Sequence, residues 1–413
     1  MKKGFKISVA ALILTAALVS FAVKAAPDAV FAGTLPETAA QTVFTGAAGA
    51  PEDVKLNISA RASCLMEADT GTVIFAKNEK AHYPIASMVK IMTLNLIFDD
   101  MEAGKLKADD RITVSRNASG MGGSQAFLDF DKQYKADDLI MSITIASAND
   151  ACVAMAEHLE GSVEGFVNRM NDKARALGCT DTVFANCTGL PSENAQYSCA
   201  RDVALMTREL TRHQAYYPYA ATWMKDLVHD GGRVTGLTNT NKLVRFYPGC
   251  DGGKTGFTGE ALHCLSATAK RGDMRLISSV IGAADSKTRF AEVSAQFNYG
   301  FANFGVKKIV EKDKTLDGEF PVALGREKTL KIKTAADFSV FGARNEAGKD
   351  VTTEVKLGEL KAPIAAGGEV GKLCVFKAGS QIGEVPLLAC SDIHKKTYGD
   401  FLGDLFGEWV NRG

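Results

Sequence analysis

The sequence lacks the features of several common protein classes. Its 48 lysines and arginines are balanced by 48 aspartates and glutamates, so a formal net charge of zero gives no electrostatic reason to expect nucleic acid as a partner. The six histidines are scattered and no zinc-type ligand spacing occurs, so we expect neither a metal site nor another cofactor. With 46% apolar and 23% charged residues in 413 positions, the composition is that of a globular protein long enough for two domains.

The nine cysteines do not follow the spacing of a disulfide framework. Their number is odd and no Cys-x-x-Cys pair occurs, so at least one thiol is free. Cys179, Cys187 and Cys199 are close enough in sequence for one pair to form. A protein in which all nine thiols stay reduced, in a reducing or anaerobic habitat, is the alternative that the sequence leaves open.

A long apolar run occurs near the N-terminus. Three lysines within the first six residues precede an apolar stretch over residues 7–23, and small residues suited to cleavage follow up to Ala25. The pattern predicts a signal peptide over residues 1–25, with an uncleaved membrane anchor as the alternative because the run is slightly long. In both cases we expect the remainder to be exported. Residues 26–56, rich in Ala, Thr, Gly and Pro, are expected to form a flexible leader.

The order of the predicted elements indicates an α/β domain. Residues 62–77 alternate as two strands about a turn, and residues 261–269 and 274–283 alternate as a second strand pair. Helices are predicted between them, over residues 150–159 and 162–177. Since strands at both ends of the segment flank a helical block, the sheet must be assembled from distant parts of the chain and covered by helices.

After residue 303 the sequence changes to short alternating runs, such as residues 329–333 and 351–357, separated by glycine, proline and charged turns. This pattern predicts a small all-β domain over residues 304–392, following a first domain at residues 57–303. We find no catalytic constellation in the β domain.

Residues 393–413 are predicted to form an amphipathic tail helix, with acidic side chains opposite an apolar half. Its seven large apolar side chains, one of them a tryptophan, make the outer face of the cytoplasmic membrane its expected partner. Packing against the chain's own β domain is the alternative, because the acidic face gains nothing from anionic lipids. Three glycines lower its helix propensity, so we expect it to be unfolded in water unless it contacts an apolar surface. The apolar residues are Tyr398, Phe401, Leu402, Leu405, Phe406, Trp409 and Val410.

The candidate nucleophile lies in a predicted helix that starts near Pro84. Lys90 falls in a stretch that is apolar on nearly every side, where an unpaired ammonium is heavily penalised, so its presence needs a functional reason. Ser87 stands three residues earlier, which places both side chains on one helical face. A buried lysine whose pKa is lowered can take the proton of a serine hydroxyl and activate it. The Ser-x-x-Lys pattern alone is weak, because about one match is expected by chance in such a chain.

Two further motifs follow in a specific order: Ser147-Ala148-Asn149 and Lys254-Thr255-Gly256. The Ser-x-Asn pattern recurs elsewhere in the chain, whereas Lys-Thr-Gly and Ser-x-x-Lys each occur once. Together the three motifs are those of penicillin-binding proteins and class A β-lactamases. On these motifs the chain resembles the serine-type D-alanyl-D-alanine carboxypeptidases, the low-molecular-weight penicillin-binding proteins, strongly over residues 59–303 and weakly beyond.

The resemblance implies a β-lactamase/transpeptidase-like fold with an antiparallel sheet, and a peptidoglycan stem peptide ending D-Ala-D-Ala as substrate. Ser87, activated by Lys90, would attack the carbonyl of the penultimate D-alanine. Ser147 would relay a proton to the departing amine, and Asn149 would hold Lys90 and the substrate amide. Water would then hydrolyse the acyl-serine, and β-lactam antibiotics would inhibit the enzyme covalently.

The resemblance also assigns the residues that bind the substrate. Lys254 would supply positive charge and Thr255 a hydroxyl for the terminal carboxylate, and Gly256 completes this substrate-binding motif. Gly252 and Gly253, immediately before it, fit a strand that a peptide backbone can approach closely. Arg289 would be the charged partner of the carboxylate. The oxyanion would be bound by the backbone N–H groups of the nucleophile and of Phe257.

The sequence departs from the family pattern in a few places. Ala148 replaces a usual glycine, residues 186–190 lack the histidine that relatives place before Gly-Leu, and Phe257 is bulky. A class A β-lactamase is one alternative, but no Glu-x-x-Leu-Asn element lies between Asn149 and Lys254. A non-catalytic β-lactam sensor or wall-binding module is another, and the intact nucleophile and lysines argue against it. The balance between hydrolysis and transpeptidation is not encoded in these motifs.

Overall fold

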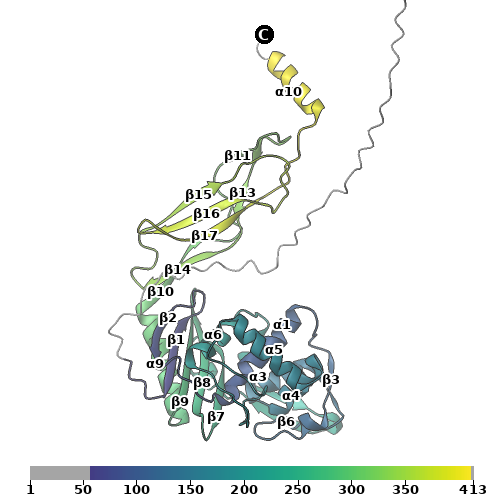
Figure 1. Cartoon of the computed structure of the whole chain (residues 1–413), viewed down its shortest axis with the longest axis vertical. Coiled ribbons are helices and arrows are strands. Elements are labelled where there is room, and N and C mark those ends of the chain that lie inside the picture. The colour runs from purple at the N-terminus through teal and green to yellow at the C-terminus, as the bar shows by residue number, and fades with distance from the viewer. Residues whose placement is uncertain (1–55, 411–413) are drawn as a thin grey trace, which may run out of the picture. The chain divides into compact units, whose positions relative to one another are not determined.

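The computed structural model describes residues 56–410, with side chains through residue 404 (Figure 1). The predicted signal peptide and all of the predicted leader except Leu56 lie outside the described residues. Within residues 56–410, no helix combines the length and the apolar character needed to cross a membrane.

A five-stranded antiparallel sheet forms the centre of the first part of the chain. Its strand order is β2-β1-β9-β8-β7. The first strand pairs with a strand more than two hundred residues later, with Ala62 opposite Ile281, which confirms that the sheet is assembled from distant segments. The strands are β1 (Ala62–Glu67), β2 (Val73–Lys77), β7 (Cys250–Thr258), β8 (Leu262–Arg271) and β9 (Met274–Ala283).

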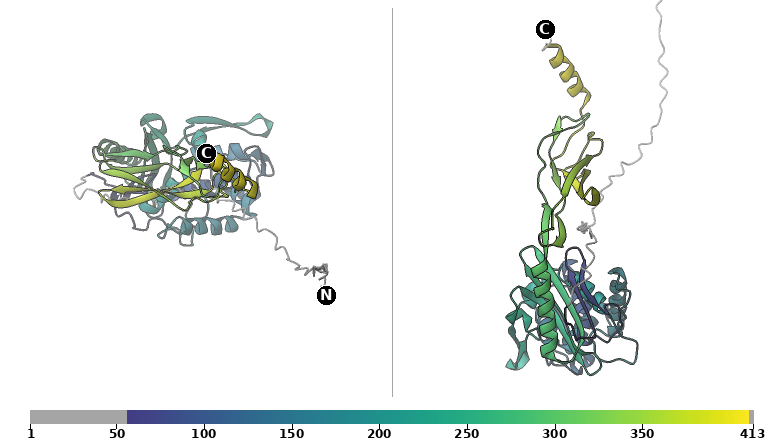
Figure 2. Two further views of the ribbon diagram at one scale, coloured as in Figure 1. Left: turned by 90° about the horizontal axis from the view of Figure 1, so that it is seen from above. Right: turned by 90° about the vertical axis from the view of Figure 1, so that its left-hand side faces the viewer.

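Both faces of this sheet are covered by helices. In β1, Cys64 and Met66 join the apolar core under α6 (Ala200–Leu210), whereas Leu65 joins the core under α9 (Ser286–Asn303). Successive side chains of a strand point to opposite faces, so α6 and α9 lie on opposite sides of the sheet (Figures 1 and 2). The predicted helix-covered sheet is confirmed.

The remaining helices of this part surround the core on the α6 side, except α8 (Leu243–Phe246), whose Leu243 joins the core under α9. The predicted helices at residues 150–159 and 162–177 are confirmed as α4 and α5. Ser162 caps the start of α5 by accepting a hydrogen bond from Gly165 N, and Gly161 ends α4 with a φ of 72°. The helices are α1 (Lys90–Glu102), α2 (Arg116–Ser119), α3 (Ala136–Ala146), α4 (Asn149–Glu160), α5 (Val163–Ala176), α7 (Tyr216–Ala220) and α8 (Leu243–Phe246), with 3₁₀ turns η1 (Ala86–Val89) and η2 (Asp230–Gly232).

Two short hairpins complete this part of the chain. They are β3 (Arg111–Thr113) with β4 (Gln133–Lys135), and β5 (Met224–Val228) with β6 (Val234–Thr238).

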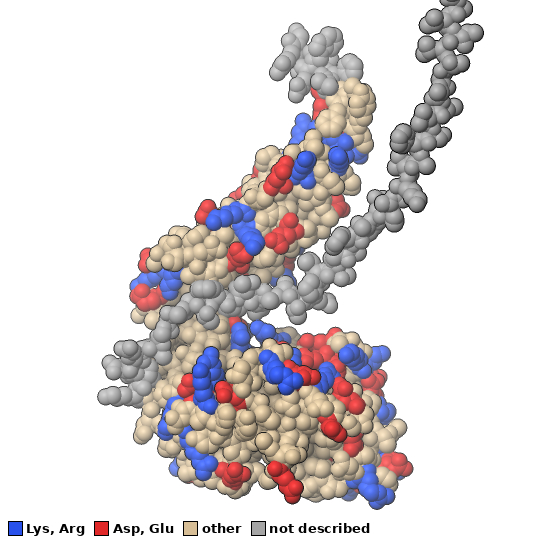
Figure 3. Space-filling view, in the orientation of Figure 1, with Lys and Arg blue, Asp and Glu red and all other residues tan. Residues whose placement is uncertain are grey.

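On the face shown in Figure 3, basic and acidic side chains are interspersed over the surface, in keeping with the zero net charge.

Between α9 and the tail the chain is all β, as predicted. A four-stranded sheet has the order β13-β17-β16-β15, β10 pairs with β14, and β11 pairs with β12. The strands are β10 (Phe304–Val310), β11 (Phe320–Pro321), β12 (Thr329–Leu330), β13 (Ile332–Thr334), β14 (Phe338–Ala343), β15 (Val351–Leu357), β16 (Glu369–Lys377) and β17 (Ser380–Ala389).

One predicted strand in this region is wrong. Residues 329–333 were expected as a single strand, but β12 and β13 belong to different sheets. Lys331 stands between them, and its carbonyl accepts from Cys390 N, which continues the register of the β13–β17 ladder and not that of β11–β12. The alternation of side chains is preserved across the break, which is why the sequence pattern could not reveal it.

The tail forms a helix, α10 (Tyr398–Val410), which begins five residues after the predicted start at residue 393, and residues 411–413 lie outside the described part of the chain. The described apolar side chains of this helix are exposed to solvent: Tyr398 is 79% exposed, Phe401 40% and Leu402 39%. The side chains of Leu405, Phe406, Trp409 and Val410, on which the predicted apolar half also depends, lie outside the described residues.

All nine cysteines fall within the described residues and all are free thiols. Eight of them are buried, and only Cys390 is exposed. Of the two arrangements that the sequence left open, the structure has the one without disulfides.

Candidate active site

Ser87 and Lys90 come together at the junction of η1 and α1. The prediction of one continuous α-helix is corrected here: Ser87 lies in the 3₁₀ turn η1, and Lys90 is the first residue of α1. A 3₁₀ turn has three residues per turn, so side chains at i and i+3 lie directly above one another. Lys90 Nζ is accordingly 3.1 Å from Ser87 Oγ.

The Lys90 amine is fully buried and has three oxygen partners. Besides Ser87, it donates to Asn149 Oδ1 at 2.6 Å and to the Thr188 carbonyl at 2.6 Å. None of the three is a carboxylate, so burial dominates and lowers the pKa of Lys90. Two of the three hydrogen-bonding positions of the amine are occupied by the Asn149 and Thr188 oxygens, which can only accept. The third position is therefore directed at the serine hydroxyl. In its neutral form the amine can therefore accept the Ser87 proton.

Asn149 is fixed by its own neighbours. It begins α4, its backbone N donates to Ser124 O at 2.7 Å, and its side-chain Nδ2 donates to Gly122 O at 2.7 Å. Because the amide nitrogen is committed to Gly122, the amide oxygen must face Lys90. The predicted partnership of Asn149 with Lys90 is present in the geometry.

Ser147 lies in the link between α3 and α4. Its backbone is left-handed, with φ of 64°, a conformation that is costly for a residue with a side chain. Its Oγ is buried and has no hydrogen-bond partner among the described residues. A buried hydroxyl without a partner is unusual in a folded protein and marks a position where an incoming group can bind. No hydrogen bond joins Ser147 to Lys90 in the described structure.

The Lys-Thr-Gly motif lies on β7, the edge strand of the sheet. Lys254 is 1% exposed, and the one hydrogen bond of its Nζ within the described residues is to the Thr255 carbonyl, at 3.3 Å. Burial, together with the positive charge of Lys90, lowers the pKa of Lys254 well below its usual value. The Thr255 hydroxyl donates to Thr240 Oγ1 at 2.8 Å. Two buried lysines thus face the same small space.

Gly256 brings β7 against the nucleophile turn. A Cβ at this position would lie 3.2 Å from Ser87 N and 2.6 Å from Ile85 O, so only glycine allows this approach. The next residue, Phe257, leaves its ring 58% exposed at the mouth of the site and stacks it on His263, with centroids 4.4 Å apart.

Arg289 reaches β7 from α9, on the other side of the strand. Its Nη1 donates to Gly256 O at 3.0 Å and to Cys264 O at 3.2 Å, and its Nη2 donates to Ser286 Oγ at 3.3 Å. The Nε atom is buried without a partner among the described residues. Arg289 therefore contacts the strand that carries the Lys-Thr-Gly motif and, at 9% exposed, is not a surface arginine.

The sequence reading missed the loop over residues 186–190, which it noted only as a departure from the family pattern. Asn186 Oδ1 accepts from the backbone N of both Thr188 and Gly189, at 3.1 and 2.7 Å, and this turn presents the Thr188 carbonyl to Lys90. Gly189 has φ of 81°, and a Cβ there would lie 1.9 Å from Ala86 O. The Asn-x-x-Gly pattern is a turn signal that could have located this loop.

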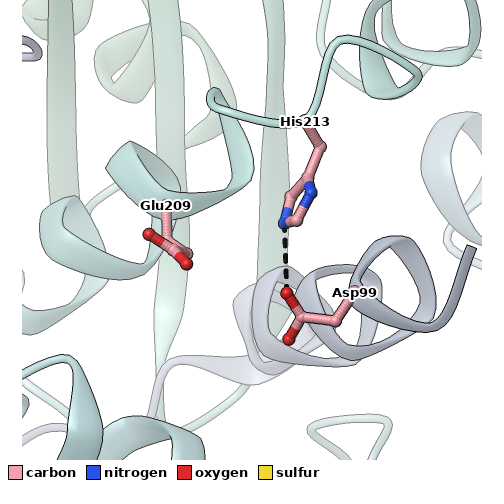
Figure 4. Close-up of side chains that lie close together, drawn as sticks. All are labelled: Asp99, Glu209 and His213. Carbon is pink, nitrogen blue, oxygen red and sulfur yellow. Dashed lines mark ion pairs between the residues drawn. The ribbon is translucent and has the colours of Figure 1, made fainter. Parts of the chain in front are cut away.

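A second polar cluster lies at the far end of α1. His213 Nε2 points to Asp99, 3.6 Å away, with Glu209 nearby (Figure 4), and His213 Nδ1 is 2.8 Å from Glu102. The Lys173 ammonium lies 2.9 Å from Glu209 and 3.1 Å from Asp99. Because this lysine fills the space between the two carboxylates, the cluster is an ion-pair network that ties α1 to α5 and α6, and it is not suited to a metal ion.

Comparison with known proteins gives matches to both parts of the chain. The family described as D-alanyl-D-alanine carboxypeptidase matches residues 47–285, and the C-terminal domain of penicillin-binding protein 5 matches residues 304–395. The D-alanyl-D-alanine carboxypeptidase DacF of Bacillus subtilis is 38% identical over 372 residues, which is 89% of this chain and 95% of the relative.

Solved structures agree with the sequence matches. Penicillin binding protein 5 from Haemophilus influenzae is 30% identical, with a TM-score of 0.67 over 83% of this chain and 100% of that chain. Penicillin-binding protein D2 from Listeria monocytogenes, solved in an ampicillin-bound form, is 28% identical, with a TM-score of 0.54 over 60% of this chain and 100% of that chain. The chain therefore belongs to the D-alanyl-D-alanine carboxypeptidase family, the low-molecular-weight penicillin-binding proteins, and is a serine hydrolase.

Proposed function

We propose that this enzyme removes the terminal D-alanine from peptidoglycan stem peptides through an acyl enzyme on Ser87. The observation that carries the proposal is the placement of the Lys90 amine, buried, 3.1 Å from Ser87 Oγ and without a carboxylate partner. A lysine base of lowered pKa beside a serine hydroxyl is the requirement for nucleophilic attack at neutral pH.

In acylation, neutral Lys90 takes the Ser87 proton while Oγ attacks the carbonyl carbon of the penultimate D-alanine. The negative charge that develops on the carbonyl oxygen is received by the backbone N–H groups of Ser87 and Phe257. The closeness of Gly256 to Ser87 N supports this pair, because it brings the following residue of β7 to the same oxygen.

Collapse of the tetrahedral intermediate requires a proton on the departing amine. Ser147 relays it from the Lys90 ammonium, and its unpartnered buried hydroxyl supports this role because nothing in the described structure competes for it. Asn149 keeps Lys90 aligned and offers its amide to the acyl group. Water then attacks the acyl-serine with Lys90 again as the base.

The terminal carboxylate of the substrate is bound at the Lys-Thr-Gly end of β7. Lys254 and Arg289 supply positive charge there, and Thr255 supplies a hydroxyl. Support comes from the absence of any carboxylate among the hydrogen-bond partners of Lys254 and Arg289 within the described residues. Two buried basic side chains without an anion favour an anionic ligand, which would stabilise the charged form of Lys254.

β-Lactams acylate Ser87 by the same route, as expected from the ampicillin-bound relative. A class A β-lactamase and a non-catalytic sensor are the competing functions. The sequence lacks the extra glutamate that a class A β-lactamase requires. A non-catalytic sensor would not require a desolvated lysine aligned on a serine.

We further propose that the chain is exported and attached to the outer face of the cytoplasmic membrane through α10. The N-terminal signal pattern and the exposed rings of Tyr398 and Phe401 support this location. The family matches support a division into a peptidase domain ending near residue 303 and a β-rich domain from residue 304.

One experiment separates the three functions. The purified enzyme is incubated with a D-Ala-D-Ala peptide and, separately, with fluorescent penicillin, and a Ser87→Ala variant is run beside it. We expect D-alanine release and persistent covalent labelling by the wild type, and neither by the variant. Rapid turnover of penicillin would indicate a β-lactamase, and labelling without peptide hydrolysis would indicate a sensor.

A further inference from the structure

A polar pocket of about 230 Å³ adjoins the turn that leads into the nucleophile. Its walls come from three segments: residues 84–86 before the nucleophile, the loop over residues 189–196, and Thr258 with Glu260 at the end of β7. The first two walls touch, since a Cβ on Gly189 would overlap Ala86 O. The pocket is therefore built onto the turn that carries Ser87.

Among the described residues that line this pocket, Glu260 is the only charged one, and it is exposed. Within residues 56–404, no hydrogen bond or ion pair involves the Glu260 carboxylate. Its backbone is nevertheless fixed, because Arg61 Nη1 donates to the Glu260 carbonyl at 3.0 Å. A carboxylate without a partner, on a fixed backbone, makes the pocket selective for a cationic group.

The path of the substrate leads to this pocket. β7 is an edge strand, so an extended peptide can lie along its free edge. With the terminal carboxylate near Thr255 and the reacting carbonyl beside Gly256 and Ser87, the peptide runs toward Thr258. At about 3.3 Å per residue, the residue before the two D-alanines lies roughly 7 Å from the terminal one, opposite the Thr258 end of the strand.

We propose that the Glu260 pocket binds an ammonium group on the side chain of the residue that precedes D-Ala-D-Ala. The inference rests on the proposed carboxypeptidase function and deepens it, because it makes stem peptides with a free side-chain amine the preferred substrates. Glu260 is a specificity-determining residue and takes no part in the chemical steps. Stem peptides whose side-chain amine has been acylated by a cross-link are then poorer substrates.

The test compares two peptides, acetyl-Lys-D-Ala-D-Ala with a free ε-amine and the same peptide with an ε-acetyl group. D-Alanine release gives kcat/KM for each. We expect wild type to favour the free amine by about 5- to 10-fold, the scale of one charge-assisted contact at a solvent-accessible site. In Glu260→Gln this ratio falls to about one, and in Glu260→Lys it drops below one.

Glu193→Gln is the matched control, because Glu193 lies in the same loop but does not line the pocket. It should keep the wild-type ratio. Penicillin labelling of every variant reports whether the nucleophile is still assembled. A wild-type ratio near one, or an unchanged ratio in labelled Glu260→Gln, overturns the proposal while leaving the carboxypeptidase function in place. If penicillin labels the wild type but the wild type releases D-alanine from neither peptide, the result contradicts the proposed function, and with it this inference.

Discussion

The Lys90 amine and the Thr188 carbonyl, 98 positions apart in the chain, are joined by a 2.6 Å hydrogen bond. Together with the bond to Asn149, this contact occupies two N–H groups of the amine and leaves the third for Ser87. A backbone carbonyl can do this without adding a negative charge, which would stabilise the ammonium form and weaken the base.

Replacing Lys90 with arginine should slow acylation by about 10²-fold or more, because a guanidinium keeps the charge but cannot accept a proton at working pH. The rate of penicillin labelling is the measurement, and circular dichroism checks the fold. Lys90→Met, which removes both charge and base, should be at least as slow. An arginine variant that acylates at a near-normal rate would show that Lys90 supplies charge only.

The acylation rate of the wild type should rise with pH, and the midpoint of this rise should lie below about 10.4, the pKa of an ordinary lysine. The sign follows from the base role: burial lowers the pKa of Lys90, so the neutral, proton-accepting form is populated at a lower pH than in an exposed lysine. Stopped-flow acylation measured between neutral and alkaline pH gives the midpoint. A limb that begins only at the ordinary lysine value would contradict the desolvated base.

Substitutions of Ser147 should affect activity far more than stability. The Ser147 hydroxyl has no hydrogen-bond partner among the described residues, so the free energy of unfolding of Ser147→Ala should lie within about 0.5 kcal/mol of that of wild type. Ser147→Gly should be more stable than Ser147→Ala by about 1 kcal/mol, because glycine accepts a φ of 64° without strain.

Both Ser147 variants should nevertheless release D-alanine at least about 10²-fold more slowly, since neither can relay a proton. Urea unfolding and peptide turnover are measured on the same preparations. If either variant retains normal turnover, the hydroxyl is not part of the proton path.

Arg289→Ala should weaken binding of the free-acid peptide by about 1.5 to 3 kcal/mol, the usual cost of losing a hydrogen bond to a charged group. The decisive comparison uses a peptide amidated at its C-terminus, which offers no carboxylate. Arg289 also binds the Gly256 and Cys264 carbonyls, so some loss of thermal stability is expected as well. Equal losses on acid and amide would assign Arg289 a structural role alone.

Deletion of the chain after Ile393 should release the enzyme from liposomes while preserving activity on soluble peptide. The described apolar side chains of α10 are exposed, so the helix has apolar surface to bury in lipid. Flotation of the full-length and truncated proteins is the measurement. Full-length protein that stays in the soluble fraction, with unchanged Trp409 fluorescence, would favour packing of the tail against the protein itself.

Much of the site could be predicted because its side chains follow a sequence order with a chemical meaning. Ser87, Lys90 and Asn149 meet as the spacing of the motifs predicted, and Arg289 reaches the Lys-Thr-Gly strand. The Thr188 carbonyl could not be predicted in the same way, because every residue carries a backbone carbonyl and only the fold decides which one points at a lysine.

In the fold, too, locally determined features could be predicted from the sequence and features set by distant contacts could not. Helix ends at Gly161 and Ser162 were readable because their capping chemistry is local. The change from α to 3₁₀ geometry at Ser87 is set by the packing of β7 and the loop at Gly189 against residues 85–87, and that packing involves contacts made far along the chain. The break at Lys331 likewise depends on which sheet each half joins.

Gly189 and Gly256 enclose the nucleophile turn from two directions, and neither has room for a single additional carbon atom. An inhibitor that acylates Ser87 therefore faces a surface made largely of main chain at these points. A mutation there that kept the inhibitor out would displace Ser87 from its own substrate by the same movement. Heritable escape from such an inhibitor must arise at other positions, where side chains can change without moving the serine.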